Sequence, residues 1–142
     1  MNMSHEELME KIIHALKEGA RLERVKIQFL RGNAKFIVVR KSSKVEIVVD
    51  VVLLLENVKS DTLFIFELKS GSKEKKAHKQ LVAYSSLILA SKEDIAMSEM
   101  IRFSRICSCW ISEKENRIVI ISEGKEQSLS EFFEFPFMFL LQ

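Results

Sequence analysis

The chain has 142 residues and a net charge of +2, with 47% apolar and 30% charged side chains, four Gly and one Pro. This composition is typical of one compact domain over residues 1–142 and not of a disordered chain. No apolar run approaches the roughly 20 residues that a membrane span needs, and the sequence opens on a capped helix instead of an export signal. We therefore expect a single cytoplasmic domain that has no membrane partner.

The first 40 residues predict one helix and two short strands. Ser4 followed by Glu7 is a capping-box pattern that predicts a helix start. An apolar stripe at helical spacing follows before Gly19: Leu8, Met9, Ile12, Ile13 and Leu16. Residues 25–29 and 36–39 have strand composition, and Gly32-Asn33 between them is a turn signal.

The rest of the chain predicts more strands around a second helix. Residues 44–56 indicate a long strand, and residues 63–69 a second strand that forms an antiparallel hairpin with it. A helix is predicted over about 73–90, and further strands over 101–112 and 117–122. The expected fold is a mixed α/β domain with one central mixed sheet flanked by helices.

The predicted hairpin brings together residues that are able to carry chemistry. Glu67 and Lys69 are two apart in a strand and project from one face. A loop over 57–60 sets Asp50 opposite Glu67 in the paired strands. Alternation places Asp50 on the same face of its strand as Val48 and Val52. Opposed residues have Cβ atoms roughly 5 Å apart, so both carboxylates could share one hard cation.

A plainer interpretation is that these groups are solvated and form surface salt bridges with Lys69. However, Asp50 lies deep in an apolar strand, where an unpaired carboxylate is costly, and two facing acids repel unless a cation lies between them. The pattern therefore favours a Mg²⁺ or Mn²⁺ site.

Three segments in this order resemble a known family: Asp50-Val51-Val52, then Phe64-Ile65-Phe66-Glu67-Leu68-Lys69-Ser70-Gly71, then Gln80-Leu81-Val82-Ala83-Tyr84. They are similar to the PD-(D/E)XK nucleases, in particular the RecB-like branch that includes exonucleases of CRISPR adaptation. The resemblance implies a restriction-endonuclease-like core and metal-dependent hydrolysis of DNA. It also implies that Asp50, Glu67 and the Leu68 carbonyl hold the metal, that Lys69 orients or deprotonates the attacking water, and that Gln80 and Tyr84 support catalysis.

The sequence departs from this branch in two respects. Cys107 and Cys109 are its two cysteines, so no iron-sulfur cluster is expected, and their spacing in a predicted strand indicates buried thiols. The first motif of the branch, a His or Glu on the opening helix, corresponds to His5 or Glu6 as a further metal ligand. The alternative that His5 is simply a histidine at a helix end stays open.

Four lysines crowd the start of the predicted second helix: Lys73, Lys75, Lys76 and Lys79. Cations there oppose the helix dipole, which favours contact with an anionic ligand such as the DNA backbone over a merely solvated face. The C-terminal stretch 132–141 holds five of the ten Phe residues. It is expected either to cap the core or to form a homodimer contact.

The sequence therefore predicts a Mg²⁺- or Mn²⁺-dependent DNA nuclease. Two alternatives stay open: a structure-selective, Holliday-junction resolvase-like endonuclease that would act as a dimer, and an inactive nucleic-acid-binding module with the same fold. The sequence does not choose between exo- and endonuclease activity, DNA and RNA, strand polarity, or biological pathway.

Overall fold

Helix α1 (His5–Leu22) opens the structure, a computed structural model that describes residues 3–40, 43–56, 62–69, 95–96, 103 and 105–141. The predicted cap is confirmed, because the Ser4 hydroxyl accepts the backbone N–H of Glu7 at 3.1 Å. The predicted apolar stripe is also the side of the helix that packs on the sheet. The helix continues beyond this stripe, through Gly19 to Leu22.

Seven strands form one mixed sheet in the order β4-β1-β2-β3-β5-β6-β7. Their bounds are β1 (Ile27–Arg40), β2 (Ser43–Leu55), β3 (Thr62–Lys69), β4 (Ile95–Ala96), β5 (Arg105–Ser112), β6 (Arg117–Ile120) and β7 (Lys125–Ser128). Strands β3 and β5 run parallel, and the other neighbours run antiparallel. The prediction of a mixed α/β protein with a central mixed sheet is thus confirmed.

One prediction about strands needs correction. Residues 25–29 and 36–39 are predicted to form two strands around a turn, but residues 27–29 and 36–39 lie in the single strand β1. The turn signal is still meaningful, because Asn33 has a left-handed φ of 49° in the middle of this strand. The short strands β4 and β7 were not predicted, and the predicted helix 73–90 lies outside the described residues.

Apolar side chains fill a core on each face of the sheet. The α1-side core lies beneath α1 and includes Leu8, Ile12, Leu16, Val51, Leu53, Leu55, Phe64, Phe66, Leu68 and Ile111. The far-side core includes Phe29, Ala34, Phe36, Ile47, Val49, Val52, Leu54, Leu63, Ile65 and Trp110. Neighbours such as Leu63 and Phe64 belong to different cores because successive strand residues point to opposite faces.

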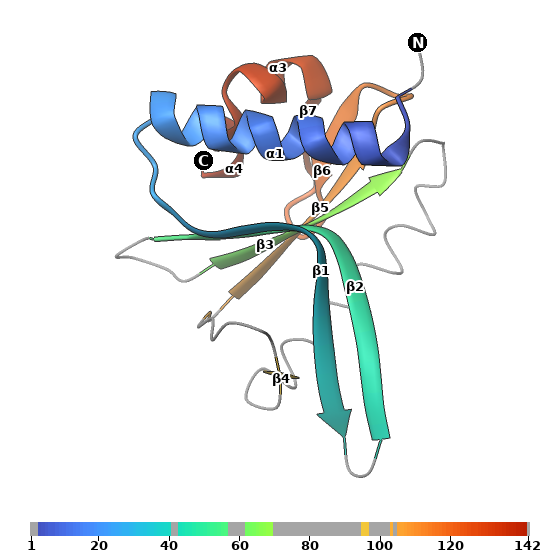
Figure 1. Cartoon of the computed structure of the whole chain (residues 1–142). Coiled ribbons are helices and arrows are strands. Elements are labelled where there is room, and N and C mark those ends of the chain that lie inside the picture. The colour runs from blue at the N-terminus through green and yellow to red at the C-terminus, as the bar shows by residue number, and fades with distance from the viewer. Residues whose placement is uncertain are drawn as a thin grey trace.

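Figure 1 shows helices α3 (Leu129–Glu134) and α4 (Pro136–Leu140) beside α1 on the same face of the sheet. Phe132, Phe137 and Phe139 of these helices are buried in the α1-side core. Of the two alternatives for the Phe-rich tail, packing on its own core is the one observed. Phe135, Met138 and Leu141 stay about half exposed.

The two cysteines are free and buried in the α1-side core, as predicted. Burial raises the pKa of the Cys109 thiol well above its ordinary value. A hydrogen bond from Cys109 lowers the pKa of Cys107, against the opposing effect of burial. Both side chains therefore serve as packing residues, and they share one polar contact.

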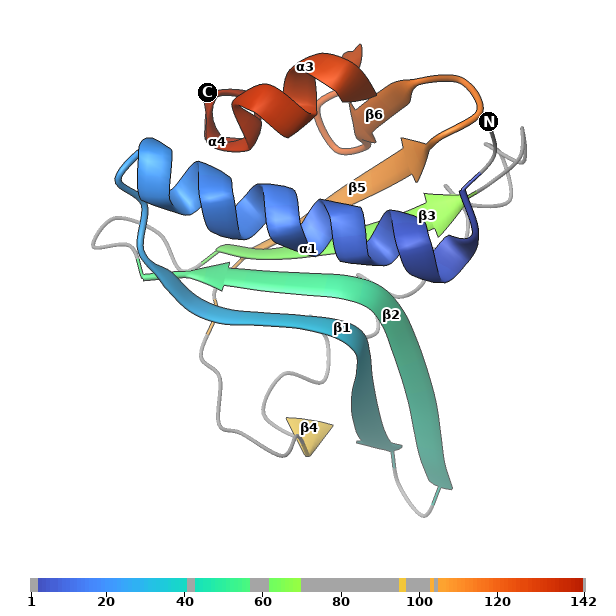
Figure 2. The same ribbon diagram turned by 45° about the horizontal axis from the view of Figure 1, so that its top comes forward.

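Figure 2 shows that the far halves of β1 and β2 bend away from α1 and extend as an arm, where the short strand β4 also pairs with β1. The pairs from Ala34↔Val49 to Arg40↔Ser43 form this arm. Asn33 and Asp50 lie where it leaves the sheet. In the described part of the chain, none of the helices has the length and apolar character that a membrane crossing requires.

Candidate active site

The side chains of β1 and β2 change face at the base of the arm. In β2, Val51 belongs to the α1-side core, whereas Val49 belongs to the far-side core. Strict alternation would keep these two residues on one face. In β1, Leu30 packs toward the α1-side core and Ala34 lies in the far-side core. The reversal thus occurs at the same level in both strands.

The reversal decides where Asp50 points. The register is the same on both sides of it, with Gly32↔Val51 before and Ala34↔Val49 after, so Asn33 and Asp50 face each other. Alternation had predicted that Asp50 shares a face with Val52. That prediction is wrong, because Val52 lies in the far-side core while the Asp50 carboxylate contacts α1.

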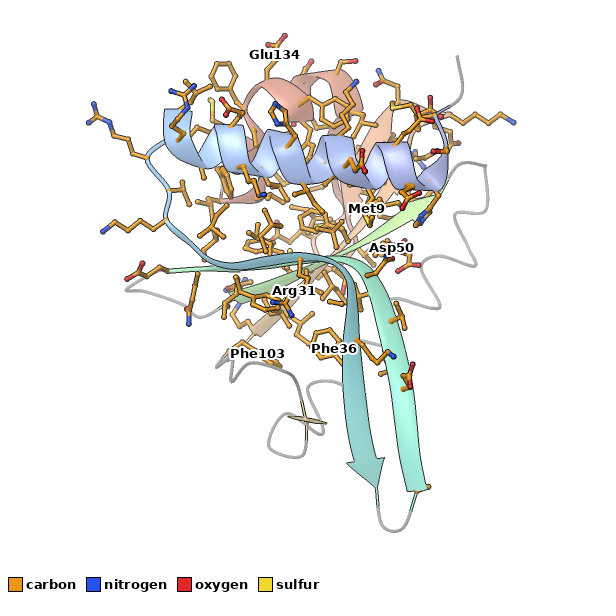
Figure 3. The ribbon with its side chains drawn as sticks, in the orientation of Figure 1. Met9, Arg31, Phe36, Asp50, Phe103 and Glu134 are labelled. Carbon is orange, nitrogen blue, oxygen red and sulfur yellow. The ribbon has the colours of Figure 1, made fainter. Side chains whose placement is uncertain are left out.

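Both carboxylate oxygens of Asp50, whose side chain is labelled beneath α1 in Figure 3, have a partner. Oδ2 accepts the backbone N–H of Leu68 at 2.9 Å, and Oδ1 lies 3.2 Å from His5 Nε2. A strand N–H points along the plane of its sheet, so this carboxylate lies close to the sheet plane between β2 and β3. The Asp50 side chain is only 14% exposed. It lies where β2 bends away into the arm and its pairing with β3 ends, a place that we call the fork.

The predicted register between β2 and β3 is confirmed. Its pairs run from Leu54↔Leu63 to Val51↔Phe66, and one further step places Asp50 beside Glu67. Glu67 is only 5% exposed. Alternation puts it on the face of Leu63 and Ile65, away from α1. The site therefore has one carboxylate in the sheet plane and a buried neighbour on the far face.

Leu68 and Lys69 end strand β3 next to these carboxylates. Leu68 is buried in the α1-side core, and its N–H is the group that Asp50 binds. Register with β5 places Trp110 beside Glu67 and Ser112 beside Lys69. The sequence did not predict these β5 neighbours, since a parallel partner leaves no turn signal in the chain.

The structure separates the two candidate ligands on α1. His5 is the first residue of the helix and contacts Asp50, which supports its inclusion in the site. Glu6 is exposed in the first turn. The plain helix-end interpretation of His5 is incomplete, because this side chain approaches a mostly buried carboxylate.

The remaining predicted site residues are Gln80, Tyr84, Lys73, Lys75, Lys76 and Lys79. All of them lie outside the described residues. Asn33 is the residue that sequence reasoning missed. Its signal was present in the Gly32-Asn33 pair, which was interpreted as an ordinary turn.

The donor set at the fork is chemically suited to a hard cation. Within the described residues, no three His, Cys, Asp or Glu side chains are grouped so that they could hold a metal ion. Mg²⁺ usually retains several waters and needs only one or two carboxylates. Asp50, Glu67 and the Leu68 carbonyl carry oxygen atoms of the type that such an ion prefers.

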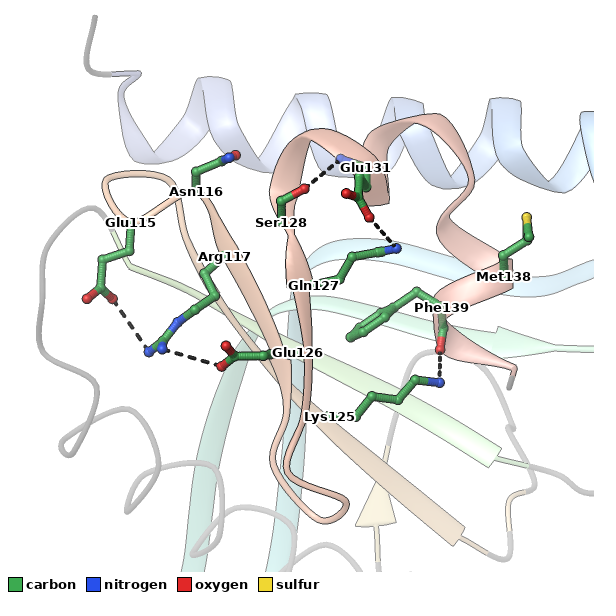
Figure 4. A pocket seen from close by; sticks show the side chains of 10 residues that line it. All are labelled: Glu115, Asn116, Arg117, Lys125, Glu126, Gln127, Ser128, Glu131, Met138 and Phe139. Atoms are coloured by element: carbon green, nitrogen blue, oxygen red, sulfur yellow. Dashed lines mark hydrogen bonds and ion pairs between the residues drawn. The ribbon is translucent and has the colours of Figure 1, made fainter.

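A surface pocket of about 670 Å³ lies elsewhere, around β7 and α4 (Figure 4). Three strands separate β7 from β2 in the sheet. Charged groups of the pocket already have partners within the protein: Arg117 lies 3.4 Å from Glu126, Lys125 Nζ donates to the Phe139 carbonyl at 2.8 Å, and Glu131 accepts from the Gln127 amide at 3.2 Å. We therefore place the candidate site at the fork and not in this pocket.

Comparison of the chain with protein-family models, with curated proteins and with solved structures finds no match in any of the three. The resemblance to PD-(D/E)XK nucleases thus stays a prediction from the sequence.

Proposed function

We propose that the chain is a metal-dependent deoxyribonuclease with a restriction-endonuclease-like core. One observation carries the proposal: the Asp50 carboxylate is held at the fork of β2 and β3 by His5 and the Leu68 N–H, at the register position beside buried Glu67. The sequence order of an Asp followed by an acid-x-Lys strand matches the resemblance, but the expected shared face is not observed, because Asp50 lies near the sheet plane and Glu67 on the far face. The two free thiols, Cys107 and Cys109, are typical of a protein in a reducing compartment such as the cytoplasm.

In this proposal, Asp50, Glu67 and the Leu68 carbonyl hold the cation, with His5 or Glu6 as a further protein ligand. When bound, a divalent cation lowers the pKa of the attacking water and offsets the charge that builds on the phosphate. Asp50 needs little reorganisation for this role, because the Leu68 N–H already fixes one of its oxygens.

Lys69 is assigned to orient or deprotonate the attacking water, with Gln80 and Tyr84 in support. The water oxygen forms a bond to phosphorus, and the bond from phosphorus to one sugar oxygen breaks. That sugar oxygen takes up a proton. One water is consumed, and a hydroxyl end and a phosphate end are formed.

The proposed partner is DNA, bound through the phosphate backbone by Lys73, Lys75, Lys76 and Lys79. A homodimer, which a resolvase-like activity would need, is a narrower proposal. The apolar side chains that the tail leaves for it are Phe135, Met138 and Leu141, which are about half exposed.

The deciding experiment is a cleavage assay on linear, circular, single-stranded and branched DNA, with Mn²⁺, with Mg²⁺ and with chelator. Asp50→Asn keeps an oxygen that can accept the Leu68 N–H but removes the charge, so we expect a folded protein without cleavage. Glu67→Gln and Lys69→Met should behave alike.

Glu46→Gln is the matched control, because Glu46 is an exposed acid on the same strand, paired with Lys35 at 3.2 Å. It should retain wild-type activity. Cleavage in chelator, or full activity of folded Asp50→Asn, would disprove the mechanism. Binding to DNA without cleavage under any condition would favour the inactive binding module.

A further inference from the structure

Asn33 lies directly across from Asp50 at the level where both strands change face. Its φ of 49° lies in the left-handed region, which Asn tolerates better than other residues with a side chain. Within a strand, such a residue rotates the chain and re-aims the side chains that follow. The preceding Leu30 and the following Ala34 pack in different cores, as this rotation requires.

Helix α1 packs closely on β1 next to Asn33. A Cβ added to Gly32 would lie 2.8 Å from Met9 Sδ and 3.1 Å from Ile13 Cδ1, so α1 packs closely on the backbone here. Residues four apart lie on one helix face, and His5 is one turn before Met9. Ile13 and Met9 therefore lie over Gly32, and His5, on the same helix face, lies next to Asp50.

Without the reversal, alternation would direct Asp50 to the far face with Val52, out of reach of His5. We propose that Asn33 is a positioning residue: its left-handed conformation turns the base of the arm over and so delivers the Asp50 carboxylate to His5 and the Leu68 N–H. A role for Asn33 in catalysis rests on the proposed nuclease. Its role in placing Asp50 is independent of that function.

The test compares Asn33→Gly, which permits a positive φ, with Asn33→Val, which disfavours it. The first readout is hydrogen exchange at the Leu68 amide, the donor to Asp50. Forcing a side chain into the left-handed region costs about 1–2 kcal/mol, which converts to roughly a 5- to 30-fold change. We expect Leu68 exchange to rise by about that factor in Asn33→Val and to stay near wild type in Asn33→Gly.

The second readout is affinity for Mn²⁺ alone, and the third is the rate of DNA cleavage. Both should fall in Asn33→Val and recover in Asn33→Gly. Asn116 offers a matched control, since it also has a φ of 49° but lies in the turn between β5 and β6. Asn116→Val should lower stability while leaving Leu68 exchange, Mn²⁺ affinity and cleavage unchanged at equal fraction folded.

Equal Leu68 protection in Asn33→Val and Asn33→Gly would overturn the proposal, as would equal effects of the two Val substitutions. If Asn33→Val does not fold, Asn33→Ala replaces it, because alanine also disfavours a positive φ without branching at Cβ. A wild-type protein that neither binds Mn²⁺ nor cuts DNA would refute the nuclease, while the exchange comparison would still decide the role of Asn33.

Discussion

The Glu23 carboxylate, just beyond α1, accepts the backbone N–H of Met138 at 2.8 Å through Oε1 and that of Phe137 at 3.0 Å through Oε2. Helix α4 has no side-chain cap at its own N-cap residue, Phe135. Glu23 therefore satisfies two N–H groups that a helix start leaves without partners. This contact joins the C-terminal end of α1 to the N-terminal end of α4.

We expect Glu23→Ala to lower the free energy of unfolding by about 1–2 kcal/mol, the usual effect of removing a helix cap. Glu23→Gln should have a smaller effect, because an amide oxygen can still accept one of the two N–H groups. Glu18→Gln is the control, since Glu18 forms an exposed ion pair with Arg21 that should contribute little. Urea denaturation of the three variants measures the differences, and equal midpoints would show that the cap is unimportant.

Gly19→Ala should be destabilising although it lies inside a helix, where Ala normally gains about 1 kcal/mol over Gly. A Cβ at this position would lie 2.4 Å from Pro136 Cγ and 2.8 Å from Cδ, so α4 would have to move. Overpacking of this kind costs about 1–3 kcal/mol. Gly32→Ala is the contrast, because its nearest contact is the flexible Met9 side chain. Thermal melts that rank Gly19→Ala above wild type would contradict the packing.

Replacing Lys73, Lys75, Lys76 and Lys79 by Gln should weaken binding to all DNA sequences alike. The log-log salt dependence should flatten by up to about 0.9 for each phosphate that a lysine no longer neutralises. A protein with Lys17, Arg21, Lys26 and Lys35 changed to Gln carries the same change in charge and should keep most of the wild-type slope. Anisotropy titrations in chelator measure binding without cleavage. Identical salt-dependence slopes for the two proteins would show that these four lysines do not contact DNA phosphates.

Truncation before Phe132 should lower thermal stability at every protein concentration, because Phe132 and Phe137 are buried in the chain's own core. Removing one large buried aromatic side chain costs about 3–5 kcal/mol, so removing several should prevent stable folding. The double variant Phe135→Ser/Met138→Ser changes only half-exposed residues and tests the proposed dimer without disturbing the core. Sedimentation should show it monomeric if the tail joins two subunits. If the wild-type protein is monomeric at high concentration, the proposed homodimer is wrong.

Stability should decline in alkaline solution partly because of Cys109. Its pKa is raised in the folded protein, so above its ordinary value of 9.0 the thiol ionises in the unfolded state first. The unfolded state then binds fewer protons, and the free energy of unfolding falls as pH rises, by at most about 1.4 kcal/mol per pH unit. The lowered pKa of Cys107 acts in the opposite direction. Denaturation at pH 7 and pH 10 should show a shallower decline for Cys109→Ala than for wild type. An equal or steeper decline would contradict the assignment.

The hairpin register could be predicted from sequence because polar residues marked its loop and apolar runs marked its strands. That register places Asp50 beside Glu67, one step beyond the Val51–Phe66 pair. The direction of the Asp50 side chain could not be predicted, because alternation assumes an unrotated strand and Asn33 breaks that assumption. Trp110 beside Glu67 was also beyond reach, since β5 pairs in parallel across a long sequence separation. The placement of the Phe-rich tail stayed open because apolar character does not specify which surface will cover it.

The sharing of one core by α1 and the helices α3 and α4 has a consequence for synthesis. A ribosome releases α1 first, but Phe132, Phe137 and Phe139 complete the core beneath it. Until residues 129–140 have left the exit tunnel, the Gly19 end of α1 lacks the surface on which Pro136 packs. Domains generally begin to fold from the N-terminus during translation, at about 5–20 residues per second. Helix α1 is made before α3 and α4, so it must wait for both of them before it can be fully buried.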